Sequence, residues 1–228
     1  MWAICLNEFR GHFKSIKSLI VVAMIFGITY LSADLMETVS SKIDIGSVGN
    51  DVYAIGTILI VYLLGFFFIT GLSHDQINRE VTSRTIRFLV TKTSKTNILL
   101  GKYIGILFFW LFCMTVSFIL ISLVSKDFLW LGLLDCMTFL SVALALNLIF
   151  SIILPKPAIS MFFGIIFALL FPALSVWSIY TDRFYVSWFK FFTPYYYSSL
   201  GEFYILINLV YAGCLLLLAI WLFKRRDL

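Results

Sequence analysis

Residues 129–154 read LWLGLLDCMTFLSVALALNLIFSIIL, an apolar run in which Asp135 is the only charged side chain. A helix needs about 20 apolar residues to cross the hydrocarbon core of a bilayer. This run is long enough to cross with some tilt or with an irregular end. It is continuously apolar and does not alternate in polarity, so it predicts a membrane-spanning helix and not a strand of a barrel.

Five further stretches have the same character. These apolar windows are Leu19–Leu35, Val52–Leu72, Ile104–Val124, Ala158–Tyr180 and Phe203–Phe223. With 61% hydrophobic and 13% charged residues among 228, the chain is too apolar to form the polar shell of a water-soluble domain. The sequence therefore predicts an all-α integral membrane protein with six transmembrane helices, built as a single domain over residues 1–228.

Lysine and arginine are distributed unequally between the loops. Thirteen lie in the N-terminal segment, in residues 73–102, in the turn at 155–157 and at the C-terminus, whereas four lie in the other connections. Basic residues accumulate on the cytoplasmic side of membrane proteins. We therefore expect a multi-pass protein of the cell membrane with both termini in the cytoplasm. The net charge of +5 has the same cause, and no nucleic-acid partner is expected.

The N-terminal segment has the periodicity of an amphipathic helix. Apolar side chains recur at spacings of four and three, at Trp2, Leu6, Phe9, Phe13, Ile16 and Ile20. Charged residues occupy the other face, which predicts an interfacial helix over residues 1–18 in the cytoplasmic headgroup layer. An equally good interpretation is a plain anchor that only orients the first span.

Residues 73–102 form the longest loop on the basic side. Ser73 and Gln76 have the spacing of a capping box, which predicts a helix that begins at His74. Thr93-Ser94 is a second turn signal, after which a helix leads into the third window. A cytoplasmic helix here could dock on a large partner. The alternative is a solvated basic loop stabilised by anionic lipid.

Residues 181–201, on the other side, are unusually aromatic. Pro194 interrupts the segment, and Ser199 with Glu202 has capping-box spacing that predicts the start of the last span. Aromatic rings with a polar edge favour the headgroup layer. The segment is therefore either re-entrant, dipping into the outer leaflet as a lid, or an aromatic belt at the interface.

Motifs of known chemistry are few. The only Gly-Lys pair, Gly101-Lys102, is not preceded by a phosphate-binding loop, and the four cysteines lack metal-ligand spacing. We therefore predict no catalytic residue and no metal site. Gly71-Leu72-Ser73-His74 faintly resembles the surroundings of an intramembrane serine nucleophile, but no buried base accompanies it. The pair Gly101 and Gly105 could allow close helix packing.

Polar residues inside the apolar runs are the default candidates for a transport pathway. Asp135 is the clearest, although its position near a helix N-terminus could be stabilised by the helix dipole alone. Asn147 could hydrogen-bond across helices. With the aromatic segment, they give the predicted pathway or gate residues: Asp135, Asn147, Trp188, Phe192, Tyr195 and Glu202.

The loop at 73–102 also carries an ordered pattern. It consists of Glu80, Thr85, Phe88-Leu89, Thr93-Ser94-Lys95 and Leu100-Gly101-Lys102. This pattern, with six spans and an N-terminal interfacial helix, resembles the signature of ABC-2-type transporter permeases, the transmembrane subunits of ABC exporters. Arg84 stands where that family commonly has glycine, and Lys95 where it commonly has arginine, which indicates a divergent branch.

The resemblance implies a partner and a mechanism. It implies a coupling helix between spans two and three that docks on a separate ABC ATPase subunit, through Arg79, Glu80, Arg84, Thr85, Arg87, Phe88 and Leu89. It also implies two copies of that ATPase, a second permease subunit of the same or a related kind, and a bacterial membrane. The permease would bind no cofactor directly, since ATP and Mg²⁺ belong to the partner.

Paired charges within the spans are lacking, so we expect a hydrophobic or amphipathic cargo such as a peptide. The alternative function is that of a non-transporting membrane immunity or sensor protein.

Overall fold

The computed structural model describes residues 1–42, 50–181 and 183–226, and these residues are helical and contain no strand. In this part of the chain, six helices are long and apolar enough to cross a membrane. They are α2 (Ile16–Lys42), α3 (Ile55–Ser73), α6 (Lys95–Ser125), α7 (Trp130–Ile153), α8 (Pro157–Tyr180) and α11 (Ile205–Arg225). The prediction of an all-α chain with six such helices is confirmed.

The helices extend beyond some of the predicted windows. α2 begins at Ile16, directly after α1 (Trp2–Lys14), and α6 begins at Lys95, well before the predicted window. The early start of α6 has a local cause, because the Ser94 hydroxyl accepts a hydrogen bond from the Asn97 N–H at 3.3 Å. This contact satisfies one of the free N–H groups in the first turn. The turn predicted at Thr93-Ser94 is confirmed.

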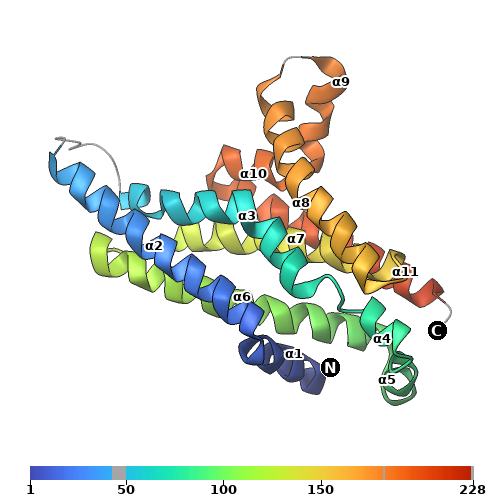
Figure 1. Cartoon of the computed structure of the whole chain (residues 1–228). Helices are drawn as coiled ribbons and strands as arrows, with labels where there is room; N and C mark the ends of the chain where they lie inside the picture. Colours follow the sequence, from blue (N-terminus) through green and yellow to red (C-terminus); the bar gives the residue numbers. More distant parts are fainter. Residues whose placement is uncertain (43–49, 182, 227–228) are drawn as a thin grey trace.

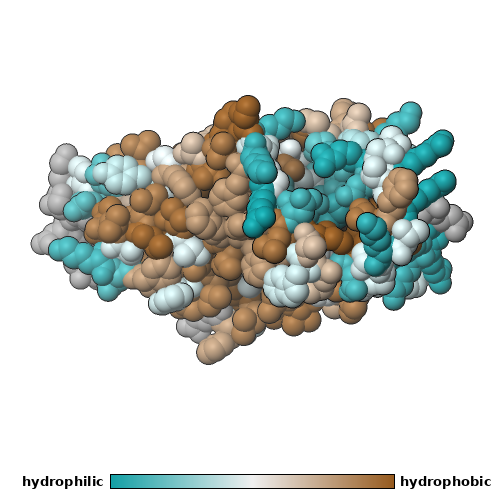
Figure 2. All heavy atoms as spheres, turned by 90° about the horizontal axis from the view of Figure 1, so that it is seen from below, coloured by the Kyte–Doolittle hydropathy of each residue, from teal (hydrophilic) through white to brown (hydrophobic). Residues whose placement is uncertain are grey.

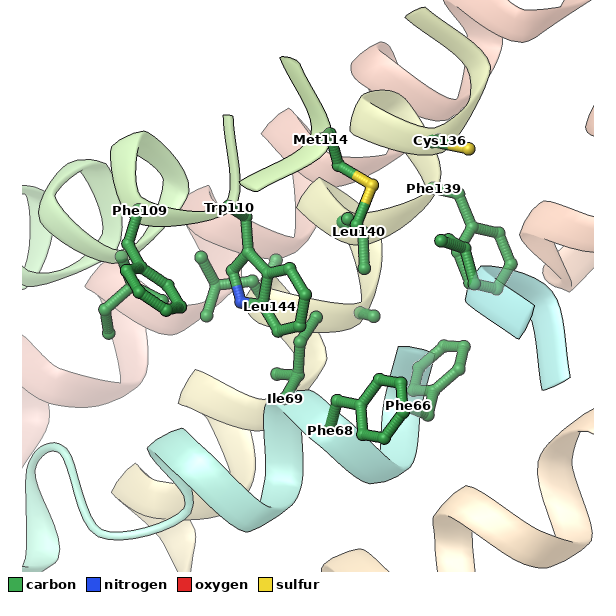
Figure 3. Close-up of a cluster of buried hydrophobic side chains, with 14 of the residues drawn as sticks. Phe66, Phe68, Ile69, Phe109, Trp110, Met114, Cys136, Phe139, Leu140 and Leu144 are labelled. Atoms are coloured by element: carbon green, nitrogen blue, oxygen red, sulfur yellow. The ribbon is translucent and has the colours of Figure 1, made fainter. Parts of the chain in front are cut away.

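α7 lies at the centre of the bundle, packed by α3, α6, α8 and α11 (Figure 1). Most of its side chains are buried, including Phe139, Leu140 and Leu144. Figure 3 shows these side chains packed against rings and aliphatic groups from α3 and α6, namely Phe66, Phe68, Ile69, Phe109, Trp110 and Met114. The apolar run at residues 129–154 therefore forms the core helix of the bundle.

The outer surface between the two ends of the bundle is apolar. Large side chains such as Leu63, Phe162 and Leu217 are 58%, 62% and 68% exposed. Figure 2 shows an apolar band with polar surface at both ends. The polar surface is more extensive at the end that carries α4 (Asn78–Thr82) and α5 (Ile86–Lys92). Apolar side chains that face outward over the whole length of the helices match a lipid surrounding.

One end of the bundle gathers the four segments that carry most of the lysine and arginine, and we call it the basic end. It comprises α1, residues 73–102, the turn at 155–157 and the end of α11 (Figure 1). The Thr82 hydroxyl donates to the carbonyl oxygen of Pro155 at 3.3 Å. Lys95 Nζ donates to the carbonyl oxygen of Arg226 at 2.7 Å. These contacts join segments that are far apart in the sequence.

The opposite end carries the aromatic segment. After α8 the chain forms α9 (Phe184–Ser187), the 3₁₀ helix η2 (Trp188–Phe192), α10 (Pro194–Leu200) and η3 (Glu202–Tyr204). The short η1 (Asn50–Ala54) leads into α3 at the same end. α9 and η2 are largely exposed, whereas α10 packs against α7, α8 and α11 (Figure 1). Pro194 is the first residue of α10, a position where its missing N–H costs nothing.

α1 packs on α6 at two glycines. A Cβ atom on Gly105 would lie 2.6 Å from the carbonyl oxygen of Cys5 and 2.9 Å from Glu8 Cβ. A Cβ on Gly101 would lie 3.0 Å from the carbonyl oxygen of Met1. Only glycine permits backbones to approach this closely. The close packing predicted for Gly101 and Gly105 is therefore present, and α1 is the helix that uses it.

Replacing Gly105 with alanine is expected to lower stability by about 1–3 kcal/mol, because α1 must move to make room for the methyl group. The matched control is Gly213→Ala in α11, where nothing lies within 4 Å of the added Cβ; there alanine should stabilise the helix slightly. Thermal unfolding of the purified protein measures both. Equal melting temperatures for the two variants would contradict this packing.

The helix start predicted at His74 is wrong. α3 continues to Ser73 with His74 as its C-cap residue, and the next helix begins at Asn78. The Ser73 hydroxyl and the Gln76 amide have no hydrogen-bond partner in the described part of the chain, so they form no capping box. The helix of the apolar run therefore ends at Ser73, where the sequence pattern places the start of a new helix.

The start predicted for the last span is also wrong. The Ser199 hydroxyl donates to the carbonyl oxygen of Tyr196 at 2.8 Å, within α10. α11 begins only at Ile205, after Gly201 turns the chain with a φ of 68°. Glu202, the second member of the supposed capping box, has a side chain outside the described residues. A positive φ suits glycine, and it separates α10 from the span.

Candidate functional site

The basic end contains a buried ion cluster around Lys102, in the first part of α6. The Lys102 side chain is 3% exposed, and its Nζ lies 2.6 Å from Glu8 Oε1 and 2.7 Å from Glu80 Oε1. Glu8 belongs to α1 and Glu80 to α4, so one buried cation joins three elements. We call Glu8, Glu80 and Lys102 the Lys102 cluster. A buried lysine is tolerated only with such partners.

Local packing explains how these side chains meet. The glycines at 101 and 105 bring α1 close enough for Glu8 to reach Lys102. α4 is held from its other side, because the N–H groups of Ile77 and Asn78 donate to Ser151 Oγ on α7 at 2.9 and 3.3 Å. Ile77 and Asn78 are both fully buried. The segment that starts α4 is therefore fixed to α1, α6 and α7 together.

The far side of the same segment is exposed. Residues 84–89, which we call the exposed tip, contain exposed Arg84, Thr85 and Arg87, and Phe88 is 75% exposed while Leu89 is half-buried. Ile86 is the anchor of α5, with 1% exposure. Basic side chains around an exposed phenylalanine form a surface suited to a protein partner.

The predicted coupling residues therefore divide into two groups. The tip residues face outward, and Arg79 does the same: its side chain is 71% exposed and its Nη1 lies 3.4 Å from Asp75 Oδ2. Glu80 faces inward to Lys102. Glu80 and Lys102, which both belong to the sequence pattern in residues 73–102, thus form an ion pair. This contact could not be predicted from their positions in the sequence.

Arg84 has a left-handed backbone, with a φ of 59°. It lies in the turn that links α4 to α5. A non-glycine residue in this region costs about 1–2 kcal/mol. Arg84 therefore introduces strain at the turn that begins the exposed tip.

Arg84→Gly is expected to stabilise this turn by up to about 1 kcal/mol, since glycine adopts a positive φ without the steric cost. Arg87→Gly, within α5, is the matched control and should destabilise by about 1 kcal/mol. Hydrogen exchange of the amides in residues 78–92 measures both. Faster exchange in Arg84→Gly than in the parent protein would contradict the assignment of strain.

Further buried polar groups lie at the basic end. Asn147 Nδ2 donates to the carbonyl oxygen of Ser73 at 2.8 Å. In the described part of the chain, Asn147 Oδ1, the Ser73 hydroxyl and the Gln76 and Asn78 amides have no partner. His74 Nδ1 lies 3.0 Å from the carbonyl oxygen of Thr70, so that ring nitrogen is directed at the backbone and not at Ser73.

At the opposite end, Asp135 is the centre of a second buried cluster. The carboxylate accepts hydrogen bonds from the Tyr62 hydroxyl on α3 and from the Ser198 hydroxyl on α10, the latter at 2.7 Å. Asp135 is 8% exposed, and no basic side chain pairs with it in the described residues. Two hydroxyl donors thus replace a counter-ion.

The same cluster holds α10 in place. Asn208 Nδ2 on α11 donates to Ser198 Oγ at 3.1 Å and to the carbonyl oxygen of Pro194 at 3.2 Å. The Tyr195 hydroxyl donates to the carbonyl oxygen of Tyr62 at 2.7 Å. We call Tyr62, Asp135, Tyr195, Ser198 and Asn208 the Asp135 cluster. It ties α10 to α3, α7 and α11.

The predicted pathway residues are not all in one place. Asp135 and Tyr195 meet in the Asp135 cluster, whereas Asn147 lies at the basic end. Trp188 and Phe192 lie in η2, 52% and 56% exposed, and the side chain of Glu202 lies outside the described residues.

Sequence reasoning missed Tyr62, Ser198 and Asn208. The available signal was that Tyr62 and Asn208 are polar residues in apolar windows, where each needs a partner.

The described residues contain no group of three His, Cys, Asp or Glu side chains that could hold a metal ion. Comparisons with known proteins identify no relative: no family model matches the chain, and no curated protein matches it. The Lys102 cluster, the exposed tip and the Asp135 cluster are the candidate functional features of the described residues.

Proposed function

We propose that this chain is the membrane-spanning subunit of an ABC exporter, moved by a separate ATP-binding subunit that docks on the exposed tip. One observation carries the proposal: a short segment exposes basic and aromatic side chains to a partner, while its inner side is bound by a buried ion pair to the spans. This ion pair joins Glu80 Oε1 to Lys102 Nζ at 2.7 Å. The match to the ABC-2-type motif at Glu80 and Lys102 supports it.

The proposed mechanism is a shift between two arrangements of the helices. ATP closes the partner subunits and displaces the exposed tip. The displacement reaches α6 through Glu80 and Lys102, α1 through Glu8, and α7 through Ser151. ATP binding favours one arrangement only if the docked partner differs between the two. The basic end is then cytoplasmic, in agreement with the distribution of lysine and arginine.

In this proposal the opposite end is the release side. Residues 181–201 are a re-entrant segment, and the Asp135 cluster holds α10 in a closed position over α3 and α7. The scarcity of paired charges in the spans favours a hydrophobic or amphipathic cargo, such as a peptide. Two copies of the ATPase and a second permease subunit complete a two-fold complex.

Affinity purification of the tagged chain from native membranes tests the proposal. We expect an ATP-binding subunit and vanadate-sensitive ATPase activity to co-purify, and Phe88→Ala to reduce the recovered activity by about tenfold. Phe184→Ala is the matched control, because Phe184 is also a highly exposed phenylalanine, at 87% against 75% for Phe88, at the other end of the bundle. A chain that purifies alone, without ATPase, would instead favour a non-transporting immunity or sensor protein.

A further inference from the structure

A groove at the basic end lies between the α1–α2 junction and the end of α3. Its volume is about 440 Å³. It is lined by Lys14, Ser15, Ile16, Lys17, Gly71, Leu72, His74, Asp75 and Arg79. We call it the α1–α3 groove. None of the exposed tip residues, 84–89, lines the groove.

The groove is rich in positive charge. Lys14, Lys17 and Arg79 contribute three cations, and Asp75, at 3.4 Å from Arg79, is the one carboxylate in the lining. Lys14 and Lys17 are exposed, and no ion pair involves either of them in the described residues. Two lysines therefore remain free to pair with an anion.

The backbone adds to this charge. Ser15 is extended, with a φ of −82° and a ψ of 122°, and separates α1 from α2. The first hydrogen bond of α2 runs from the Leu19 N–H to the carbonyl oxygen of Ser15, at 3.1 Å. The N–H groups of Ile16 and Lys17 precede that bond, so they are free at the helix N-terminus, which favours an anion.

A second observation also indicates a ligand. A cavity of about 180 Å³ adjoins the groove and shares Ser15, Leu72, Asp75 and Arg79 with it. Gln76 lines this cavity, is 7% exposed, and has neither amide atom hydrogen-bonded. A buried unpaired amide is costly without a partner. Here it offers both a donor and an acceptor to a molecule in the cavity.

The groove also lies where the first membrane-crossing helix begins and where α3 ends. Ile16 begins the first membrane-crossing helix, and His74 is the C-cap residue of α3. Next to the groove, α2 exposes Ile16, Leu19 and Ile20, which are 75%, 50% and 62% exposed. Along α2, a cationic surface is thus followed directly by an apolar surface. Such a surface complements a molecule with an anionic head and an apolar tail.

From these observations we infer that the α1–α3 groove binds the headgroup of an anionic phospholipid. The phosphate pairs with Lys14, Lys17 and the first N–H groups of α2, and the acyl chains lie along the exposed apolar side chains of α2. Basic pockets at the ends of spans recognise anionic lipids in this way. The apolar continuation on α2 favours a lipid over free phosphate. This inference does not depend on the proposed export function.

The test uses the purified protein in detergent, together with any subunit that co-purifies. Melting temperature is measured against increasing dioctanoyl phosphatidylglycerol, dioctanoyl phosphatidylcholine, or inorganic phosphate. We expect phosphatidylglycerol to stabilise at about tenfold lower concentration than phosphatidylcholine. The variant Lys14→Ala/Lys17→Ala should lose this preference. The matched control Lys92→Ala/Lys156→Ala removes the same charge from exposed positions at the same end and should keep it.

Two further arms complete the test. Lys14→Arg/Lys17→Arg conserves the charge and should retain the preference, which guards against a variant that merely folds poorly. Stabilisation by inorganic phosphate as strong as that by phosphatidylglycerol would show that the anion is soluble and would overturn the lipid assignment. Equal effects of the two lipids on the parent protein, or equal losses in the groove and control variants, would overturn the site itself.

Discussion

Replacing Lys102 with methionine is expected to lower the free energy of unfolding by about 3–5 kcal/mol. The substitution keeps an unbranched side chain of similar length but removes the cation between two carboxylates. Glu8 Oε1 and Glu80 Oε1, now 2.6 and 2.7 Å from Lys102 Nζ, would face each other without a counter-charge. Lys102 is 3% exposed, whereas the side chains of Glu8 and Glu80 are 21% and 19% exposed, so water compensates the two carboxylates only in part.

Thermal unfolding of the purified protein measures this effect. The triple variant Lys102→Met/Glu8→Gln/Glu80→Gln should recover most of the loss, because no unpaired charge remains. Lys156→Met, at an exposed position of the same end, is the control and should change stability by less than about 0.5 kcal/mol. If Lys102→Met has the same melting temperature as the parent protein, Glu8, Glu80 and Lys102 do not form a buried cluster.

The second large effect is expected for Asp135→Leu. The substitution leaves the hydroxyls of Tyr62 and Ser198 without their acceptor in a buried site. Hydrogen bonds to charged groups contribute about 1.5–3 kcal/mol each, so a loss of about 3 kcal/mol is expected. The loss should be local. Amide hydrogen exchange should rise in α10, which Ser198 joins to α7, and stay unchanged in residues 78–92 at the basic end.

A double-mutant cycle gives the control for this prediction. Ser198→Ala alone should destabilise by about 1.5–3 kcal/mol, but should cost clearly less in the background of Asp135→Leu, where only the contact of Ser198 with Asn208 remains to be lost. Fully additive effects would show that the two side chains do not interact. Exchange in α10 that is the same in Asp135→Leu and in the parent protein would show that the Asp135 cluster does not hold this helix.

The spans could be predicted from the sequence because the signal is local. A long apolar run has one favourable structure in lipid, and each of the six windows corresponds to a helix in the structure. The ends were harder to predict. Capping boxes at Ser73 and Ser199 have the right spacing, yet α3 ends at Ser73 and Ser199 lies within α10. A three-residue spacing is a weak signal beside a long apolar helix.

The clusters could be predicted only in part, because they depend on contacts between distant helices. Asp135 stands out as a charge in an apolar run, but the sequence does not show that Tyr62 and Ser198 are its donors. Glu80 and Lys102 belong to one motif, but the sequence does not show that Glu80 faces inward or that Glu8 joins it. The sequence identifies candidate residues, whereas their partners follow from the packing of α1 and α4 at the basic end and of α3 and α10 at the opposite end.

The docking of an ATP-binding subunit on the exposed tip is the central claim. Its most direct test places a photo-activatable amino acid at position 88 in native membranes, and at position 184 as the control. We expect an adduct with an ATP-binding subunit at position 88, where the side chain is 75% exposed, and none at position 184. Adducts with lipid alone at position 88, and no nucleotide-binding protein, would contradict the claim.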